Sequence, residues 1–237
     1  MPGRRSLLGS LVALLLVGSA LTAATALAGP NDPQLRPRTA DVKLAKTLVL
    51  SRSELPGGFV DKGPQKQTSV APNVPCAEPN LHALVMTADV NSHRFVRSRT
   101  GSYAELDFEG TFFRHPADAE KAVGSMMSKA IGSCLKGYVV AGFDKGAKGK
   151  AKIVSTHVTP LSEAIGDLHV RMWDLNLAFQ VRGITLRAEL VLAFYRRGRV
   201  VSSMMMDTLG GLSELEAKDV SESVTVRLEA LPPSAVV

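Results

Sequence analysis

The sequence predicts a single α+β domain behind an export signal: a twisted antiparallel β-sheet with helices packed on one face. Strand-like segments occur in runs, and the helical segments stand apart from them instead of alternating with single strands. The chain has 237 residues, of which 45% are hydrophobic and 21% charged, a composition typical of a globular core. Its 20 Gly, 13 Pro and 2 Cys exclude collagen-like and cysteine-dense proteins.

The first 28 residues are predicted to form a cleavable signal peptide. Arg4 and Arg5 precede a strongly apolar segment at 7–17, and an A-x-A pattern places the cleavage between Ala28 and Gly29. We therefore expect a secreted or extracytoplasmic protein of the cell envelope. If the signal is not cleaved, it would instead serve as an N-terminal membrane anchor. The general secretory and twin-arginine routes both remain open.

The folded domain is predicted to span residues 39–231. Residues 29–38 contain three prolines without an apolar period, which is typical of a flexible linker. Residues 232–237 form a short tail after the last helical pattern. The sequence shows neither an internal repeat nor a second linker.

Three helices are predicted, at residues 40–50, 116–137 and 213–231, because apolar residues recur there at helical spacing. Thr39 or Asp41 is a suitable cap for the first helix. The second begins with proline, which suits the first helical position. The third begins with the capping-box pattern S-x-x-E.

Strands are predicted from alternating or β-branched segments. Trp173 is expected in the core, because it belongs to an alternating apolar series in a β-meander. A lysine-rich loop is expected between two of the strands. The predicted strands are 95–97, 102–113, 138–143, 153–159, 173–181, 184–194 and 200–206.

The two cysteines, Cys76 and Cys134, both lie in the exported part of the chain. An even count in an exported protein favours one disulfide, which the chain-entropy model values at about 4 kcal/mol. Two buried free thiols are the alternative. A metal site is not expected, because neither cysteine has a Cys or His within three residues.

Known catalytic motifs are absent from the sequence. It contains neither G-x-S-x-G nor H-E-x-x-H, and no two of the five histidines are four residues apart. We therefore predict no catalytic residue, no metal and no cofactor. A Ser-His-Asp set assembled by the fold stays open as an alternative, because such triads do not depend on sequence order.

A short basic segment contains Lys145, Lys148, Lys150 and Lys152, in a chain whose net charge is +6. The segment is either a solvated hairpin edge or a contact with an anionic surface, such as a phosphate-bearing wall polymer or acidic lipid heads. Nucleic acid is not expected as a partner, because no aromatic residues are interspersed with the lysines.

The solvent-facing side of the meander provides the candidate binding site. Its polar, charged and aromatic side chains have the composition of a small-molecule site, although an ordinary solvated face is the alternative. The residues that we expect to line a ligand groove are Asn176, Gln180, Arg187, Glu189 and Tyr195.

Short motifs along the domain resemble a group of exported actinobacterial sensor-type domains, the extracellular domains of receptor Ser/Thr kinases and their stand-alone secreted or lipoprotein relatives. The motifs are residues 53–59 (SELPGGF), Pro75-Cys76, Ser133-Cys134-Leu135, Gly166-Asp167, the hairpin at 196–199 and the last helix. The resemblance implies a twisted antiparallel sheet backed by helices, with a groove that binds a ligand.

The expected function is therefore that of an exported, non-enzymatic module of the cell envelope. It would bind a small or wall-derived ligand, or an envelope protein. The alternatives are an extracytoplasmic hydrolase and an envelope-attached structural protein.

Overall fold

The structure is a computed structural model, and it describes residues 31–64, 79–147 and 149–237. The strands are β1 (Gln34–Leu35), β2 (Val60–Pro64), β3 (Val85–Asn91), β4 (His93–Arg99), β5 (Ser102–Phe113), β6 (Lys152–Ile165), β7 (Leu168–Val181), β8 (Ile184–Arg197) and β9 (Val200–Leu209). The helices are α2 (Thr39–Leu48), the 3-10 turn η2 (Arg52–Glu54), α3 (Pro116–Met126), α4 (Lys129–Ala147), α5 (Glu214–Glu229) and α6 (Pro233–Val236).

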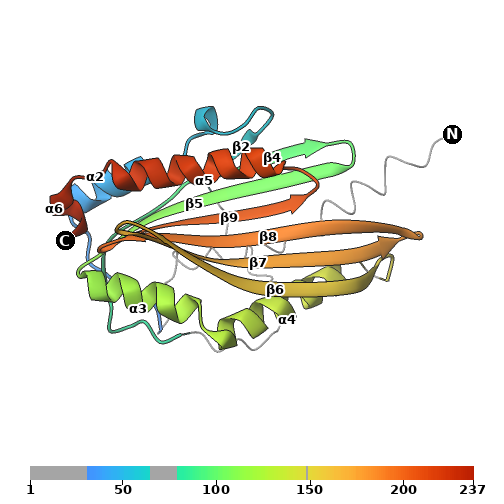
Figure 1. Cartoon of the computed structure of the whole chain (residues 1–237), viewed down its shortest axis with the longest axis horizontal. Coiled ribbons are helices and arrows are strands. Elements are labelled where there is room, and N and C mark those ends of the chain that lie inside the picture. Colours follow the sequence, from blue (N-terminus) through green and yellow to red (C-terminus); the bar gives the residue numbers. More distant parts are fainter. Residues whose placement is uncertain (1–30, 65–78, 148) are drawn as a thin grey trace.

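The strands form one open, mixed sheet in the order β1-β3-β5-β9-β8-β7-β6 (Figure 1). Neighbouring strands are antiparallel except β1 and β3, which run parallel. β3 and β4 pair with successive parts of β5, and β2 pairs with β4. The predicted fold class, a single α+β domain on a largely antiparallel sheet, is confirmed.

Helices cover both faces of the sheet (Figure 1), whereas the sequence pattern placed them on one. α2 and α5 pack on one face, where Val224 of α5 joins a cluster with Met204 and Met206 of β9. α3 and α4 pack on the other, where Leu135 of α4 joins Met205. A central strand that is buried on both faces has apolar residues at successive positions, and the methionines of β9 show this pattern.

The single helix predicted at 116–137 is two helices, α3 and α4, and the second continues to Ala147. Residues 138–143 were expected to form a strand, but they lie inside α4, so this prediction was wrong. Their β-branched residues favour a strand locally, yet Tyr138 and Phe143 are both buried against the sheet. Tertiary packing therefore overrides the local propensity. At Gly132 a Cβ would lie 2.6 Å from Trp173, so glycine allows α4 to approach the predicted core tryptophan.

Both ends of the domain are more structured than predicted. Gln34–Leu35, inside the expected linker, pairs with β3 as β1, and β3 itself was not predicted. The expected tail contains α6, whose Ala235 is buried. The first helix has Arg38 as its N-cap without a side-chain hydrogen bond, so neither Thr39 nor Asp41 is the cap.

The capping box of the last helix is confirmed. The Ser213 hydroxyl accepts a hydrogen bond from the backbone N–H of Glu216, and the Glu216 carboxylate accepts one from the N–H of Ser213. These reciprocal bonds satisfy donors that would otherwise lack partners at the helix start. The S-x-x-E pattern therefore correctly predicted where α5 begins.

β6, β7 and β8 extend beyond the rest of the sheet, and we call this part the three-strand extension. β9 pairs with β8 only as far as Glu189, so residues 184–188 pair with β7 alone. β6 accompanies β7 outward to the Lys152–Gln180 pair. One face of the extension packs on the end of α4 through Phe143. The other lies beyond the part of the sheet that α5 covers (Figure 1).

Candidate functional site

A buried ion pair joins the covered part of the sheet to α2. Arg199 donates two hydrogen bonds to the carboxylate of Asp41, at 2.9 and 2.8 Å, and a third to the carbonyl of Phe113. The Arg199 hydrogen bonds hold the pKa of Asp41 below its ordinary value, and Thr87 also donates to this carboxylate. Both charged groups are buried, so each depends on the other for compensation.

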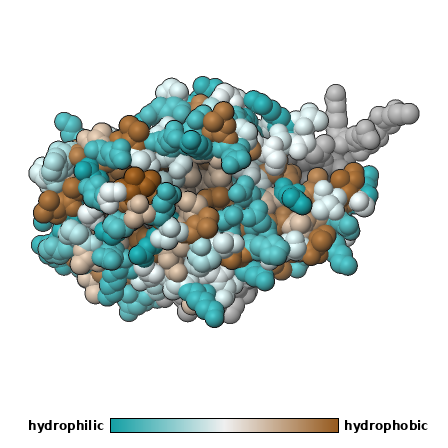
Figure 2. Space-filling model, viewed as in Figure 1, coloured by the Kyte–Doolittle hydropathy of each residue, from teal (hydrophilic) through white to brown (hydrophobic). Residues whose placement is uncertain are grey.

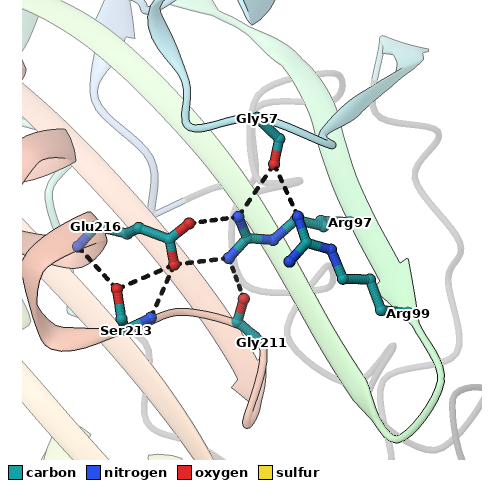
Figure 3. A network of polar contacts seen from close by, with 6 residues as sticks. All are labelled: Gly57, Arg97, Arg99, Gly211, Ser213 and Glu216. Carbon is teal, nitrogen blue, oxygen red and sulfur yellow. Dashed lines mark hydrogen bonds and ion pairs between the residues drawn. The ribbon is translucent and has the colours of Figure 1, made fainter.

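A second arginine network holds the start of α5 (Figure 3). The buried Arg97 guanidinium contacts both carboxylate oxygens of Glu216, at 2.6 and 3.0 Å, and donates to the carbonyls of Gly57 and Gly211. It also lies over the ring of Phe59, 4.9 Å from the centroid. The Arg97 hydrogen bond lowers the pKa of Glu216 to about 2. These contacts tie α5, β4 and the loop before β2 together.

Two further arginines hold the C-terminal end of α5. Arg197 donates to the carbonyls of Leu228, Glu229 and Leu231 at the end of α5, where a cation suits the helix dipole. Arg227 pairs with Glu54 and donates to the carbonyl of Val49. Where helices cover the sheet, these arginines are structural elements and are not available to a ligand.

The face of β5 that points toward α3 and α4 carries carboxylates that the sequence analysis did not single out. Glu105 lies opposite Asp207 of β9 in register, and both are buried. The Tyr103 hydroxyl donates to Glu105, and Arg94 lies 3.8 Å from it. Burial first, and the charge of Glu105 second, raises the pKa of Asp207 well above its ordinary value.

A second pair of acids lies farther along the same face. Asp89 and Glu109 are hydrogen-bonded to each other, and burial is the main cause of the raised pKa of each. Thr111 and Ser203 donate to Glu109. Two carboxyls in this arrangement share a proton readily. The alternation of acidic with apolar residues along 104–109 was the signal in the sequence.

These acids do not amount to a metal centre. Within the described ranges, no group of three or more His, Cys, Asp or Glu side chains is placed to hold a metal ion. The raised pKa values of Asp89, Glu109 and Asp207 instead connect the stability of the sheet to pH.

Four of the five predicted groove residues lie together on the uncovered side of the extension, and we call this the open face. Asn176 of β7 is paired with Glu189 of β8, and Arg187 lies two residues farther toward the turn on the same face. Asn176, Gln180 and Arg187 are exposed, and Glu189 is half-buried. The structure therefore places these four as the alternation predicted.

The fifth residue, Tyr195, is not available. It shares the face, but only 1% of its surface is exposed, because it lies in the core cluster beneath α5. Its hydroxyl forms a 2.8 Å hydrogen bond with Ser221 of that helix. The prediction that Tyr195 faces outward was wrong, since the helix covering this face was not foreseen. The open face consequently lacks the aromatic member that was expected.

The open face is polar, and only some of its side chains form hydrogen bonds with neighbouring residues. Asn176 donates a 2.8 Å hydrogen bond to Asp174. Burial, and then the charge of Asp174, raises the pKa of Glu189. None of the described residues forms a hydrogen bond or ion pair with the side chains of Arg187 or Gln180. These two groups thus differ from the arginines under the helices, each of which has protein partners.

The lysine-rich segment joins a helix to a strand and is not a β-hairpin, because α4 takes the place of the expected strand. Lys150 and Lys152 are exposed near the start of β6. Lys145 belongs to the last turn of α4, but its side chain lies outside the described residues, as does all of Lys148.

Two other predictions concern residues that the structure does not describe. Cys76 lies outside the described residues, whereas Cys134 is half-buried on α4. The Cys76–Cys134 disulfide therefore stays a prediction. The proposed cleavage site at Ala28 and Gly29 also lies outside the described residues.

A fold-assembled hydrolytic triad requires a histidine between a carboxylate and a nucleophile. His93 forms a 2.8 Å contact with Asp61 at the edge of the sheet, where both side chains are well exposed. No described Ser or Thr hydroxyl is hydrogen-bonded to this ring.

Among the described segments, no helix has the length and apolar character needed to cross a membrane.

Comparison with known proteins yields only distant similarities. No protein-family model matches the chain, and no curated protein matches it. The extracellular domain of PknH from Mycobacterium tuberculosis is 13% identical, covering 82% of this chain and 98% of that chain with a TM-score of 0.36. LpqN from Mycobacterium tuberculosis, which is involved in cell envelope biogenesis, is 9% identical. The match covers 74% of this chain and 78% of that chain, with a TM-score of 0.27. TM-scores this low carry no argument about function.

Proposed function

We propose that this protein is an exported, non-enzymatic binding module of the cell envelope, and that the open face holds its ligand. One observation carries the proposal: Arg187 and Gln180 are exposed beside the Asn176–Glu189 pair, and no described residue satisfies them. A guanidinium without a structural partner is free to bind a ligand, whereas Arg97 and Arg199 are occupied within the fold.

The chemistry of the open face indicates the class of ligand. Arg187 suits a carboxylate, because the guanidinium forms paired hydrogen bonds with its two oxygens. The amides of Asn176 and Gln180 can both donate to and accept from peptide and hydroxyl groups. Glu189 can accept from an amine or an amide. These residues extend along the strands over roughly 13 Å, which suits an elongated polar molecule such as a wall-derived glycopeptide.

Thermal unfolding of the mature protein, with and without a mixture of soluble muropeptides, tests the proposal. We expect muropeptides to raise the melting temperature of the wild type. The variant Arg187→Ala/Glu189→Ala should lose this stabilisation while unfolding at nearly the same temperature without ligand, since surface substitutions change stability by only about 0.5 kcal/mol.

A matched control removes one positive and one negative charge elsewhere. Lys218→Ala/Glu222→Ala breaks an exposed ion pair on α5 and should retain the muropeptide response. Equal stabilisation of the wild type and the Arg187→Ala/Glu189→Ala variant would remove the open face from consideration. Native mass spectrometry of protein recovered after export would identify a co-purified ligand of another class.

A further inference from the structure

The end of the three-strand extension is basic, and the acid nearest to it along the chain is the exposed Asp144 on the last turn of α4. No Asp or Glu occurs in residues 145–162 or 175–188, which form the β6 side and the β7–β8 side of this end. Besides Arg187 of the open face, three described cations lie exposed there: Lys150, Lys152 and Arg182. None of the described residues forms an ion pair with them. We call these three residues, together with Val154 and Ile184, the basic tip.

The basic tip projects from the molecule. Arg182 and Gly183 form the β7–β8 turn, where both residues have a positive φ, 52° and 82°. Because β9 does not extend to Ile184, the turn lies at the far end of the extension, opposite α2 and α6 (Figure 1). A projecting turn can approach a flat surface before the rest of the protein does.

The basic tip also exposes large aliphatic side chains beside its cations. Ile184 is 64% exposed and Val154 is 56% exposed. Figure 2 shows hydrophobic and hydrophilic side chains next to each other at this end of the molecule. A purely ionic contact with a phosphate polymer would gain nothing from these aliphatic groups. A bilayer interface accepts both, because cations meet lipid headgroups and aliphatic side chains enter the acyl boundary.

We propose that the basic tip docks this protein on an anionic lipid bilayer. Lys150, Lys152 and Arg182 contact the headgroups, while Ile184 and Val154 enter the interface. The site goes beyond the proposed ligand function, because it uses other side chains than the open face.

Vesicle co-sedimentation tests the proposal with the mature protein. We expect binding to vesicles of phosphatidylcholine mixed with phosphatidylglycerol, and much weaker binding to phosphatidylcholine alone or at high salt. The variant Lys150→Gln/Lys152→Gln/Arg182→Asn should bind the anionic vesicles roughly a hundredfold more weakly, because each cation near such a surface contributes to the attraction. Asn is chosen at 182 because it tolerates a positive φ.

Two further variants make the outcome specific. Lys43→Gln/Lys46→Gln/Lys121→Gln removes the same charge from exposed positions on α2 and α3, so it should retain wild-type binding. The variant Ile184→Ser/Val154→Ser should bind vesicles several-fold more weakly than the wild type does, but its binding to soluble polyphosphate should be unchanged. Equal binding by the tip variant and the control would overturn the proposal.

If the Ile184→Ser/Val154→Ser variant binds vesicles as well as the wild type does, the contact is purely ionic and the bilayer proposal fails. Melting temperatures of all variants show whether each is folded. The muropeptide response reports on the open face independently, so failure of one proposal leaves the other intact.

Discussion

The covered and the uncovered parts of the sheet use arginine in opposite ways. Under the helices, Arg97 and Arg199 are buried and fully engaged by carboxylates, carbonyls and aromatic rings. On the three-strand extension, Arg182 and Arg187 are exposed and have no ion-pair partner among the described residues. The difference follows from what covers the sheet, since a helix over a charged group requires a partner for that group. The same residue type therefore stabilises the fold where helices cover the sheet and is exposed where they do not.

Removing the buried arginine should have the largest effect. Arg199→Ala leaves the Asp41 carboxylate buried without its cation, so we expect the free energy of unfolding to fall by about 3–5 kcal/mol. Urea denaturation provides the measurement. Arg187→Ala, on the open face, should change the stability by less than about 0.5 kcal/mol. Similar losses for both variants would break the distinction between the covered and the uncovered parts of the sheet.

A glycine under α2 tests how closely that helix covers the sheet. At Gly110 of β5 a Cβ would lie 2.7 Å from the carbonyl oxygen of Ala45 and 3.0 Å from the Leu48 Cβ. Gly110→Ala should therefore destabilise the protein by about 1–3 kcal/mol, because the helix must shift outward. Gly57→Ala, with nothing within 4 Å of the added Cβ, is the control. A neutral Gly110→Ala variant would mean that α2 lies farther from β5.

The Arg97–Glu216 pair predicts a loss of stability in acid. The pKa of Glu216 is about 2 in the folded protein against an ordinary value of 4.5. A carboxyl whose pKa is lowered by folding stabilises the folded state at pH values above its pKa in the unfolded chain. This stabilisation disappears as the pH falls from the unfolded pKa through the folded pKa. Glu216→Gln should thus be less stable than the wild type at pH 7, and the difference should shrink between about pH 4.5 and 2. A pH-independent difference would contradict this account.

The buried acid Asp207 predicts a change of the opposite sign. Its pKa is raised above the ordinary value of 3.8 by burial and by Glu105, so ionisation destabilises the folded state. Asp207→Asn should therefore raise the melting temperature at neutral pH, and the gain should fade as the pH falls toward 3.8. A calorimetric pH series on both proteins measures the gain. A lower melting temperature at pH 7 would show that the charged form is needed.

Local signals in the sequence were sufficient for several features. The capping box at Ser213 and Glu216 marks the start of α5, because its hydrogen bonds involve neighbours in the chain. The alternation in β7 places Trp173 in the core and Asn176 outside, because side-chain direction in a strand alternates with each residue. Four members of the candidate site were predictable for this reason.

Long-range packing explains where those signals misled. Residues 138–143 favour a strand by composition but form a helix, because Tyr138 and Phe143 bury their rings against the sheet. Tyr195 follows the same alternation as Arg187 and Glu189, yet it is buried because α5 crosses the sheet at its position. The strand β3 depends on pairing with β5, which a local pattern does not reveal.

The sequence by itself determined the composition of each face: which residues of β7 and β8 are polar, and that the last helix begins after Ser213. The tertiary structure decided which parts of those faces meet water. α5 ends its coverage before the three-strand extension, and β9 stops at Leu209 while β8 continues to the turn. Such coverage depends on contacts between residues far apart in the chain, so the set of polar residues that stays exposed is decided only when the helices pack on the sheet.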